Sequence, residues 1–319
     1  MVLIKVDTSP KRELGGKDKA SVSSGSAITV SDQLTKVLLA PCLIATFLLG
    51  RFLPGLTAFF TGSKLYTPAN YVYDHTTVFD DTILTWGTDY ILAITHTLLC
   101  LRILSCKTSS ANSTLKSVAT LLVASFALST FCGAICHQFL YNKIDRWYFR
   151  LLWRICVGSV GAAGGAIGLC AGELAKIPLG KGEIVHFPVP VLPSYFWKVW
   201  GAFFFGVIWI GAYSMKNPAC DIFLTGVTQA PPTLYLAFVL VNRSSWKSIV
   251  PMETIIILLV GLLSNCLLLP GYDFMNYLKL RDGFCNVFLH TVLFCSWSAQ
   301  AVTLRTFVSK LEGNSTKQE

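Results

Sequence analysis

Charge is scarce in this chain: charged residues make up 13% of the sequence, whereas soluble domains carry roughly 25%. Apolar residues supply 53%, and the mean hydropathy is +0.57. There is no Cys-x-x-Cys pair, which argues against a zinc knuckle or a thioredoxin-type site, and no Gly-Lys-Ser/Thr, which a phosphate-binding loop requires. Much of the net charge of +9 lies next to apolar stretches, where membrane topology and anionic head groups explain it. We therefore expect membrane lipids, and no nucleic acid, as partners.

Long apolar stretches dominate the chain. A membrane-spanning helix needs about 20 mostly apolar residues, and eight stretches reach or approach that length. They lack the alternation of apolar and polar residues that a membrane barrel shows. The sequence thus predicts an all-α fold, a polytopic integral membrane helical bundle. The stretches are Val37–Phe60, Ile83–Leu104, Val118–Tyr141, Leu151–Gly172, Val191–Tyr213, Ile222–Val241, Ile249–Leu269 and Phe284–Leu304.

The first stretch differs from the others because Gly50-Arg51 interrupts it and Pro54 follows. A charge at the membrane centre costs roughly 2.5–3.5 kcal/mol. This segment is therefore predicted to be a tilted span, a re-entrant piece or an interfacial helix. The other seven stretches, from Ile83 to Leu304, are expected to form a seven-helix core, with the first as an extra N-terminal hydrophobic helix.

The distribution of Lys and Arg predicts three parts and an orientation. Residues 1–35 are basic and polar and are expected to form a disordered cytoplasmic tail. Residues 36–305 form the transmembrane domain, with its core at 83–304, and residues 306–319 a short cytoplasmic tail. Lys and Arg are more frequent on the side of both termini, which predicts that both are cytoplasmic. The sequons at Asn112, Asn242 and Asn314 then face the cytoplasm and should carry no glycan.

Several polar residues fall at one predicted depth near the outer ends of three stretches. At 1.5 Å per residue, Asp89 and His290 lie about 9 Å inside their helices, and His137 lies about 6 Å inside. Asp145 follows in the next outer loop, and Asn286 is at i−4 from His290 on the same helix face. These side chains could meet as a metal site or a proton relay. The alternative is that each one tethers neighbouring helices by hydrogen bonds.

Four of these positions, together with Gly133, carry a resemblance to a known superfamily. Gly133-Ala-Ile-Cys-His137 ends one helix, Asp145 precedes the next, and Asn286-Val-Phe-Leu-His290 lies on the last. The arrangement resembles the seven-transmembrane superfamily of alkaline ceramidases and progestin/adiponectin-type receptors. That family has Ser-xxx-His, Asp and His-xxx-His at the corresponding places. Its three histidines hold zinc, and it hydrolyses lipid amides.

The resemblance implies a site but with two departures. Gly133 replaces the family's serine, and Asn286 replaces one zinc histidine; an amide is a poor zinc ligand. The implied metal ligands are His137 and His290, with the carboxylate of Asp89 or Asp282 completing the set, and Asp145 is the implied catalytic residue. The expected function is then either a divergent metal-dependent lipid-amide hydrolase, with zinc as a possible cofactor, or an inactive relative.

Two other classes of function stay open. A transporter or channel for protons or a small solute would use Asp89 with His96, two helical turns apart, and the sixth stretch, where Gln229 and Pro231-Pro232 could expose backbone carbonyls. More often, a proline in a membrane helix is only a kink. A non-enzymatic membrane scaffold or receptor would need none of these groups.

Glycines recur on one face of the fourth stretch at spacings of three and four residues. Such a face lets another helix approach closely. It predicts tight helix packing and no chemistry. The glycines are Gly158, Gly161, Gly165, Gly168 and Gly172.

Overall fold

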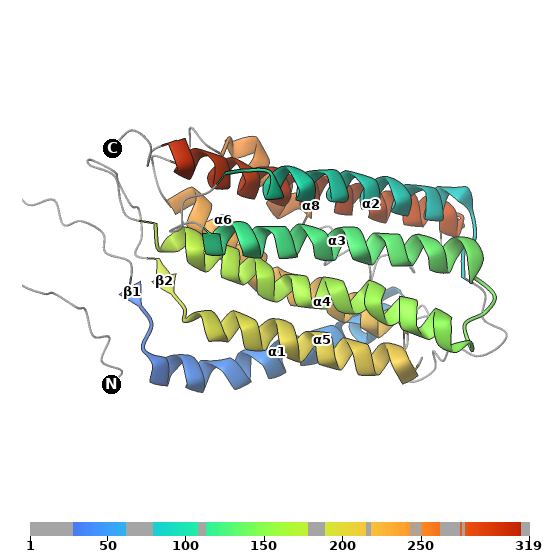
Figure 1. The fold of residues 1–319 in the computed structure, drawn as a ribbon. Coiled ribbons are helices and arrows are strands. Elements are labelled where there is room, and N and C mark those ends of the chain that lie inside the picture. The colour runs from blue at the N-terminus through green and yellow to red at the C-terminus, as the bar shows by residue number, and fades with distance from the viewer. Residues whose placement is uncertain are drawn as a thin grey trace, which may run out of the picture.

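The computed structural model describes residues 28–61, 79–107, 113–177, 189–214, 218–242, 246, 250–261, 275 and 278–313. Over these ranges the chain is mainly helical, and the long helices lie along one common axis as a bundle (Figure 1). The predicted all-α helical bundle is therefore confirmed. Residues 1–27 lie outside the described residues, so the disorder of the N-terminal tail stays a prediction.

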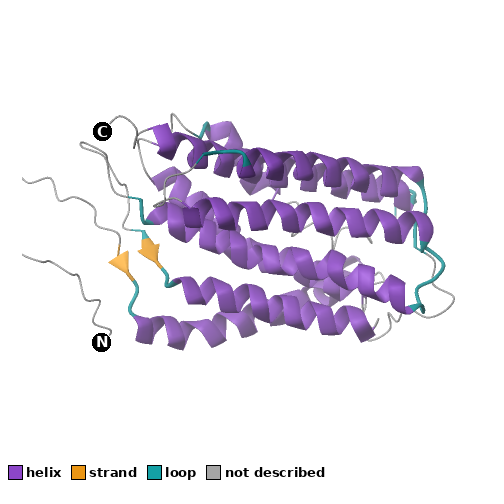
Figure 2. Cartoon of the chain, viewed as in Figure 1, coloured by secondary structure: helices purple, strands orange, loops and turns teal. Residues whose placement is uncertain are grey.

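Seven long helices and two very short strands make up the labelled elements. The strands, β1 (Ile28–Thr29) and β2 (Pro190–Val191), pair in parallel at one end of the bundle (Figure 2). A shorter apolar helix spans Met252–Gly261. The long helices are α1 (Asp32–Thr61), α2 (Ile83–Leu104), α3 (Ser113–Phe139), α4 (Trp147–Ala175), α5 (Ser194–Ser214), α6 (Pro218–Asn242) and α8 (Asp282–Gly313).

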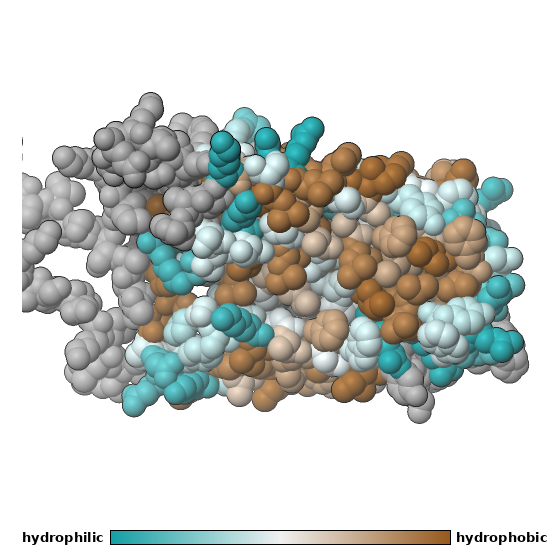
Figure 3. All heavy atoms as spheres, in the orientation of Figure 1, coloured by the Kyte–Doolittle hydropathy of each residue, from teal (hydrophilic) through white to brown (hydrophobic). Residues whose placement is uncertain are grey.

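Within the described ranges, six helices are long and apolar enough to cross a membrane. Large apolar side chains such as Ile94 and Leu98 are more than half exposed, as expected for a lipid-facing surface. On the visible face, hydrophobic residues fill the middle and hydrophilic residues gather toward the two ends (Figure 3). The chain is thus an integral, multi-pass membrane protein. The candidate spans are Asp32–Gly50, Ile83–Leu104, Ser113–Phe139, Trp147–Ala175, Leu224–Asn242 and Gly283–Ser309.

The helices match the predicted stretches in number and order, but several ends differ. α2 has the predicted bounds, whereas α8 continues past Leu304 to Gly313, into the segment predicted as a tail. α1 is one continuous helix through Gly50-Arg51 and Pro54. Of the seventh stretch, the structure describes a helix over Met252–Gly261, and residues 262–270 lie outside the described part.

Helices α2 and α8 lie side by side and run in the same direction (Figure 1). Near their first residues, Thr82 lies against Gly283. Two turns further along, Asp89 contacts His290, and two turns beyond that His96 lies edge-on to Trp297. In this register, each of these residues of α2 lies beside a particular residue of α8.

Four of the five glycines on this face of α4 pack against α5, as the spacing predicts, whereas a Cβ at Gly172 would meet nothing within 4 Å. A Cβ atom placed on Gly165 would lie 2.6 Å from the Trp197 carbonyl oxygen and 2.7 Å from Cα of Gly201. Gly168 lies directly against the Trp197 ring. In lipid, where burial of apolar surface does not drive helices together, such close approach supplies the packing energy. α4 is accordingly the most enclosed candidate span, because 78% of the residues in its apolar segment are buried.

One carbonyl that the double proline of α6 leaves without its helical partner accepts a bond from a neighbouring helix. Pro232 has no N–H to donate to the Thr228 carbonyl four residues earlier. Nε1 of Trp200 donates to that carbonyl oxygen instead, at 3.1 Å, and Nε2 of Gln229 donates to the Val160 carbonyl at 3.2 Å. The carbonyl at Thr228 is therefore satisfied within the bundle rather than offered to a solute. This arrangement favours a structural kink at these prolines.

Replacing Trp200 with phenylalanine should leave the Thr228 carbonyl buried without a donor. We expect a loss of about 1–3 kcal/mol in the free energy of unfolding, measured by denaturant titration in detergent micelles. Trp86→Phe is the matched control, because its indole also donates to a carbonyl, that of Asp81, but at an exposed site. Equal losses in the two variants would show that the bond to Thr228 is not the cause.

Candidate functional site

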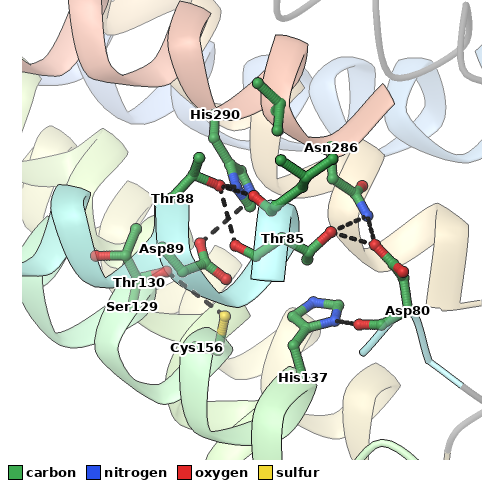
Figure 4. A network of polar contacts seen from close by, with 12 residues as sticks. Asp80, Thr85, Thr88, Asp89, Ser129, Thr130, His137, Cys156, Asn286 and His290 are labelled. Carbon is green, nitrogen blue, oxygen red and sulfur yellow. Dashed lines mark hydrogen bonds and ion pairs between the residues drawn. The ribbon is translucent and has the colours of Figure 1, made fainter. Parts of the chain in front are cut away.

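A cluster of polar side chains lies between α2, α3 and α8, at the end of the bundle where α2 and α8 begin (Figure 4). We call it the α2–α3–α8 cluster. Three of its members, Asp89, His137 and His290, are the predicted metal ligands. The cluster consists of Asp80, Thr85, Thr88, Asp89, His137, Asn286 and His290.

The centre of the cluster is a row of three groups, a carboxylate, an imidazole and a hydroxyl. Oδ1 of Asp89 lies 3.3 Å from Nε2 of His290, and Nδ1 of His290 lies 2.6 Å from Oγ1 of Thr88. Asp89 is buried, with 5% of its surface exposed, and the His290 side chain is 15% exposed. Figure 4 shows the His290 ring reaching from α8 across to Thr88 and Asp89 on α2. The row thus joins two helices through a buried acid–base pair.

Counting protons restricts the charge of this row. The Thr88 hydroxyl has one proton, and it lies 2.6 Å from both the Leu84 carbonyl oxygen and Nδ1 of His290. If it donates to Leu84, then Nδ1 carries a proton, and a second proton must lie between Nε2 and Asp89. The pair is then neutral overall. If Thr88 donates to His290, the row keeps a net negative charge. A charge deep in a membrane bundle is costly, which favours the neutral form.

Asp80, just before α2, collects hydrogen bonds at the edge of the cluster. Its carboxylate accepts from the Thr82 hydroxyl at 3.0 Å, from Nδ2 of Asn286 at 3.2 Å and from the Thr85 hydroxyl. Burial raises the pKa of this carboxyl, but the hydrogen bonds from Thr85, Thr82 and Asn286 outweigh it and hold the pKa below its ordinary value. Asp80 therefore stays ionised, and Asn286 serves as a donor to it.

His137 approaches the cluster from the end of α3. Its Nδ1 lies 2.8 Å from the backbone carbonyl oxygen of Asp80, so Nδ1 carries the proton. The ring packs edge-on against Phe79 and Trp153. Nε2 of the neutral ring then carries the lone pair. A backbone carbonyl that fixes Nδ1–H in this way is typical of both metal-binding and acid–base histidines.

The types of donor suit zinc, but their placement does not form a ligand set. Within the described part of the chain, no three His, Cys, Asp or Glu side chains are grouped so that they could hold a metal ion. The side chain of Asp282 lies outside that part. A zinc site at His137, His290 and Asp89 thus stays a prediction, and we derive no step through a metal.

Asp145, the predicted catalytic residue, is not brought into the cluster. It lies in the turn between α3 and α4 with 55% of its side chain exposed, and its carboxylate is 3.8 Å from Nε of Arg146. Sequence depth placed it close to the membrane edge, but depth does not say which way a turn residue points. The nearest loop carboxylate in the cluster is Asp80 instead, which sequence reasoning missed.

The space beside Gly133 is filled by the site carboxylate. A Cβ at Gly133 would lie 3.1 Å from Oδ2 of Asp89 and 3.5 Å from Sγ of Cys156. The Cys156 sulfur in turn lies 3.7 Å from the Ser129 hydroxyl. At the position where the resemblance to the ceramidase superfamily expects a serine, this chain therefore has a glycine that makes room for Asp89.

Comparison with protein-family models, curated proteins and solved structures gave no match. The resemblance to the ceramidase superfamily thus rests on the five sequence positions alone. What the structure itself defines is a class: a multi-pass helical membrane protein with an acid–base cluster at one end of its bundle.

Proposed function

We propose that this protein is a membrane-embedded hydrolase of lipid amides, related in its arrangement to the ceramidase superfamily. The observation that carries the proposal is the buried contact between Asp89 and His290, with His137 at the same end of the bundle. A buried carboxylate is expensive in a membrane protein and is a functional candidate for that reason. Neither imidazole is fully enclosed, and the proposal requires that a lipid head group at this end of the bundle reach them.

The cluster supplies the proton transfers that amide hydrolysis needs. A water molecule gives a proton to the lone pair on Nε2 of His137, and its oxygen forms a bond with the amide carbonyl carbon. The C–N bond then breaks, and the leaving nitrogen takes a proton from the Asp89–His290 pair, which the proton held by His137 then replaces. The products are a fatty acid and an amine. Thr88 and Asp80 act as positioning residues, because each fixes Nδ1 of one imidazole.

The proposal predicts loss of activity when an acid or base of the cluster is replaced. Purified protein in mixed micelles is incubated with a panel of N-acyl lipids, and fatty-acid release is followed by mass spectrometry. We expect release by the wild type and a decrease of at least about 100-fold in Asp89→Asn, His290→Ala and His137→Ala. Thr291→Ala is the control on the same helix, since Thr291 is exposed and its hydroxyl bonds to the Val287 carbonyl of its own helix. No release by the wild type would overturn the proposal and favour a scaffold.

Metal content distinguishes two forms of the hydrolase. Elemental mass spectrometry of the wild type is compared with the His137→Ala/His290→Ala double variant. Near-stoichiometric zinc in the wild type alone would support the predicted metal site at His137, His290 and Asp89. Hydrolysis that persists in wild-type protein stripped by a chelator would instead assign the reaction to the acid–base groups alone.

Transport of protons or a small solute is the second candidate. The observation that favours it is His96, a fully buried histidine two turns further along α2 from Asp89. The double proline of α6 does not add to this candidate, because Trp200 satisfies the carbonyl at Thr228. Uptake by proteoliposomes that is lost in Asp89→Asn, without any lipid hydrolysis, would select transport.

A further inference from the structure

His96 is a fully buried imidazole with one nitrogen that lacks a partner. Its Nδ1 lies 2.8 Å from the carbonyl oxygen of Leu92, one turn earlier in α2, and therefore donates to it. Nε2 then carries a lone pair, and within the described part of the protein it has no hydrogen-bond partner. Phe126 and Trp297 lie edge-on to the ring at 5.9 and 5.8 Å. A buried acceptor of this kind is expected to bind a molecule that donates a hydrogen bond to it.

Two unpartnered groups on α8 complement His96. Trp297 is 2% exposed, and among the residues that the structure describes its buried Nε1–H has no acceptor. Gln300 is 1% exposed and lies one turn further along α8, and its Oε1 likewise has no donor among those residues. The three atoms thus offer one donor and two acceptors. None of them bonds to another, although the rings of His96 and Trp297 are neighbours.

We propose that a buried water molecule binds between α2 and α8 and bridges these three groups. Water accepts one hydrogen bond from Nε1 of Trp297 and donates its two protons to Nε2 of His96 and Oε1 of Gln300. Buried water makes about three such bonds to groups that otherwise lack partners. The site contains no charged group among these three residues, which favours a neutral guest over an ion.

Two further hydroxyls without a hydrogen-bond partner in the described part of the chain lie beyond this site, toward the other end of the bundle. Thr303 follows Gln300 by one turn of α8, and Thr120 of α3 lies beside Cys100 of α2, which bonds to its carbonyl. Both hydroxyl oxygens are buried. The proposed water site and these two hydroxyls together therefore form a buried polar layer between α2, α3 and α8. It is independent of the proposed hydrolase, because none of its groups belongs to the α2–α3–α8 cluster.

Pulsed radiolytic labelling of the full-length protein in detergent tests this site directly. Hydroxyl radicals form from water, so a buried side chain is oxidised only where water touches it. Trp200 is the matched control, since it is equally buried but its Nε1 bonds to the Thr228 carbonyl. We expect Trp297 to be oxidised several-fold more than Trp200, and His96→Phe to remove the excess. Equal protection of Trp297 and Trp200 would overturn the proposal.

A stability cycle gives an independent measurement. His96→Phe and Gln300→Met each remove one acceptor while nearly conserving volume. If a shared water bridges them, each single variant lowers the unfolding midpoint, and the double variant lowers it no further than the worse single. Single variants as stable as the wild type would show that nothing binds there, and additive losses would show that the two groups share no guest. Lipid hydrolysis, assayed in parallel, reports on the other site alone.

Discussion

Alanine in place of Gly165 is expected to destabilise the protein by about 3 kcal/mol, and valine to leave no folded protein. The new Cβ would lie 2.6 Å from the Trp197 carbonyl oxygen and 2.7 Å from Cα of Gly201. Both atoms belong to the backbone of α5, so no change of side-chain rotamer can relieve the clash. The two helices must move apart, and the packing between α4 and α5 is lost along their length.

Gly172→Ala is the control for this prediction, because it changes the same helix by the same atom. A Cβ at Gly172 has no neighbour within 4 Å. Alanine also favours a helix by roughly 1 kcal/mol over glycine, so this variant should be neutral or slightly more stable. Unfolding by SDS titration from mild detergent, followed by circular dichroism, measures both. A Gly165→Ala midpoint equal to that of Gly172→Ala would contradict the close packing.

The sequence predicted the bundle well because apolar length and glycine spacing are local properties. The bounds of α2 follow from a continuous apolar run that ends in polar residues. The end of α8 was missed, because the apolar run stops at Leu304 while Phe307 and Val308 beyond it are fully buried in the core. Their burial depends on neighbours such as Trp246, which packs against Phe307 and cannot be identified from local pattern.

For the site, the depth of each residue in the membrane could be predicted from the sequence. The direction in which each side chain points, and the residue that it contacts, could not. Asp89 and His290 were predicted at equal depth, and the structure brings them into contact. Depth could not place Asp145, whose side chain turns outward beside Arg146. Asp80 was missed, although an aspartate shortly before a helix is a familiar hydrogen-bond acceptor for its first turn. Its bonds to Asn286 and to His137 arise only from the tertiary fold.

Cutting the Asp89–His290 pair on one side should cost about 3–5 kcal/mol in the free energy of unfolding, because it leaves an uncompensated buried group. We expect this loss in His290→Leu, where the buried carboxylate keeps no imidazole, and a similar loss in Asp89→Leu. In the double variant both polar groups are absent, and an apolar pair can pack in their place. Its stability should return close to that of the wild type. Denaturant unfolding of all four proteins completes the cycle.

This cycle separates a helix tether from a site held for chemistry. A tether stabilises the fold, so a double variant as unstable as either single variant would mean that the pair holds α2 against α8. Losses that add up to the sum of the two singles would instead mean that the two side chains do not interact. A double variant as stable as the wild type, but without lipid hydrolysis, would mean that the fold gains nothing from keeping a carboxylate and an imidazole in its membrane core. In that case the pair is retained for its proton chemistry, as the proposed hydrolase requires.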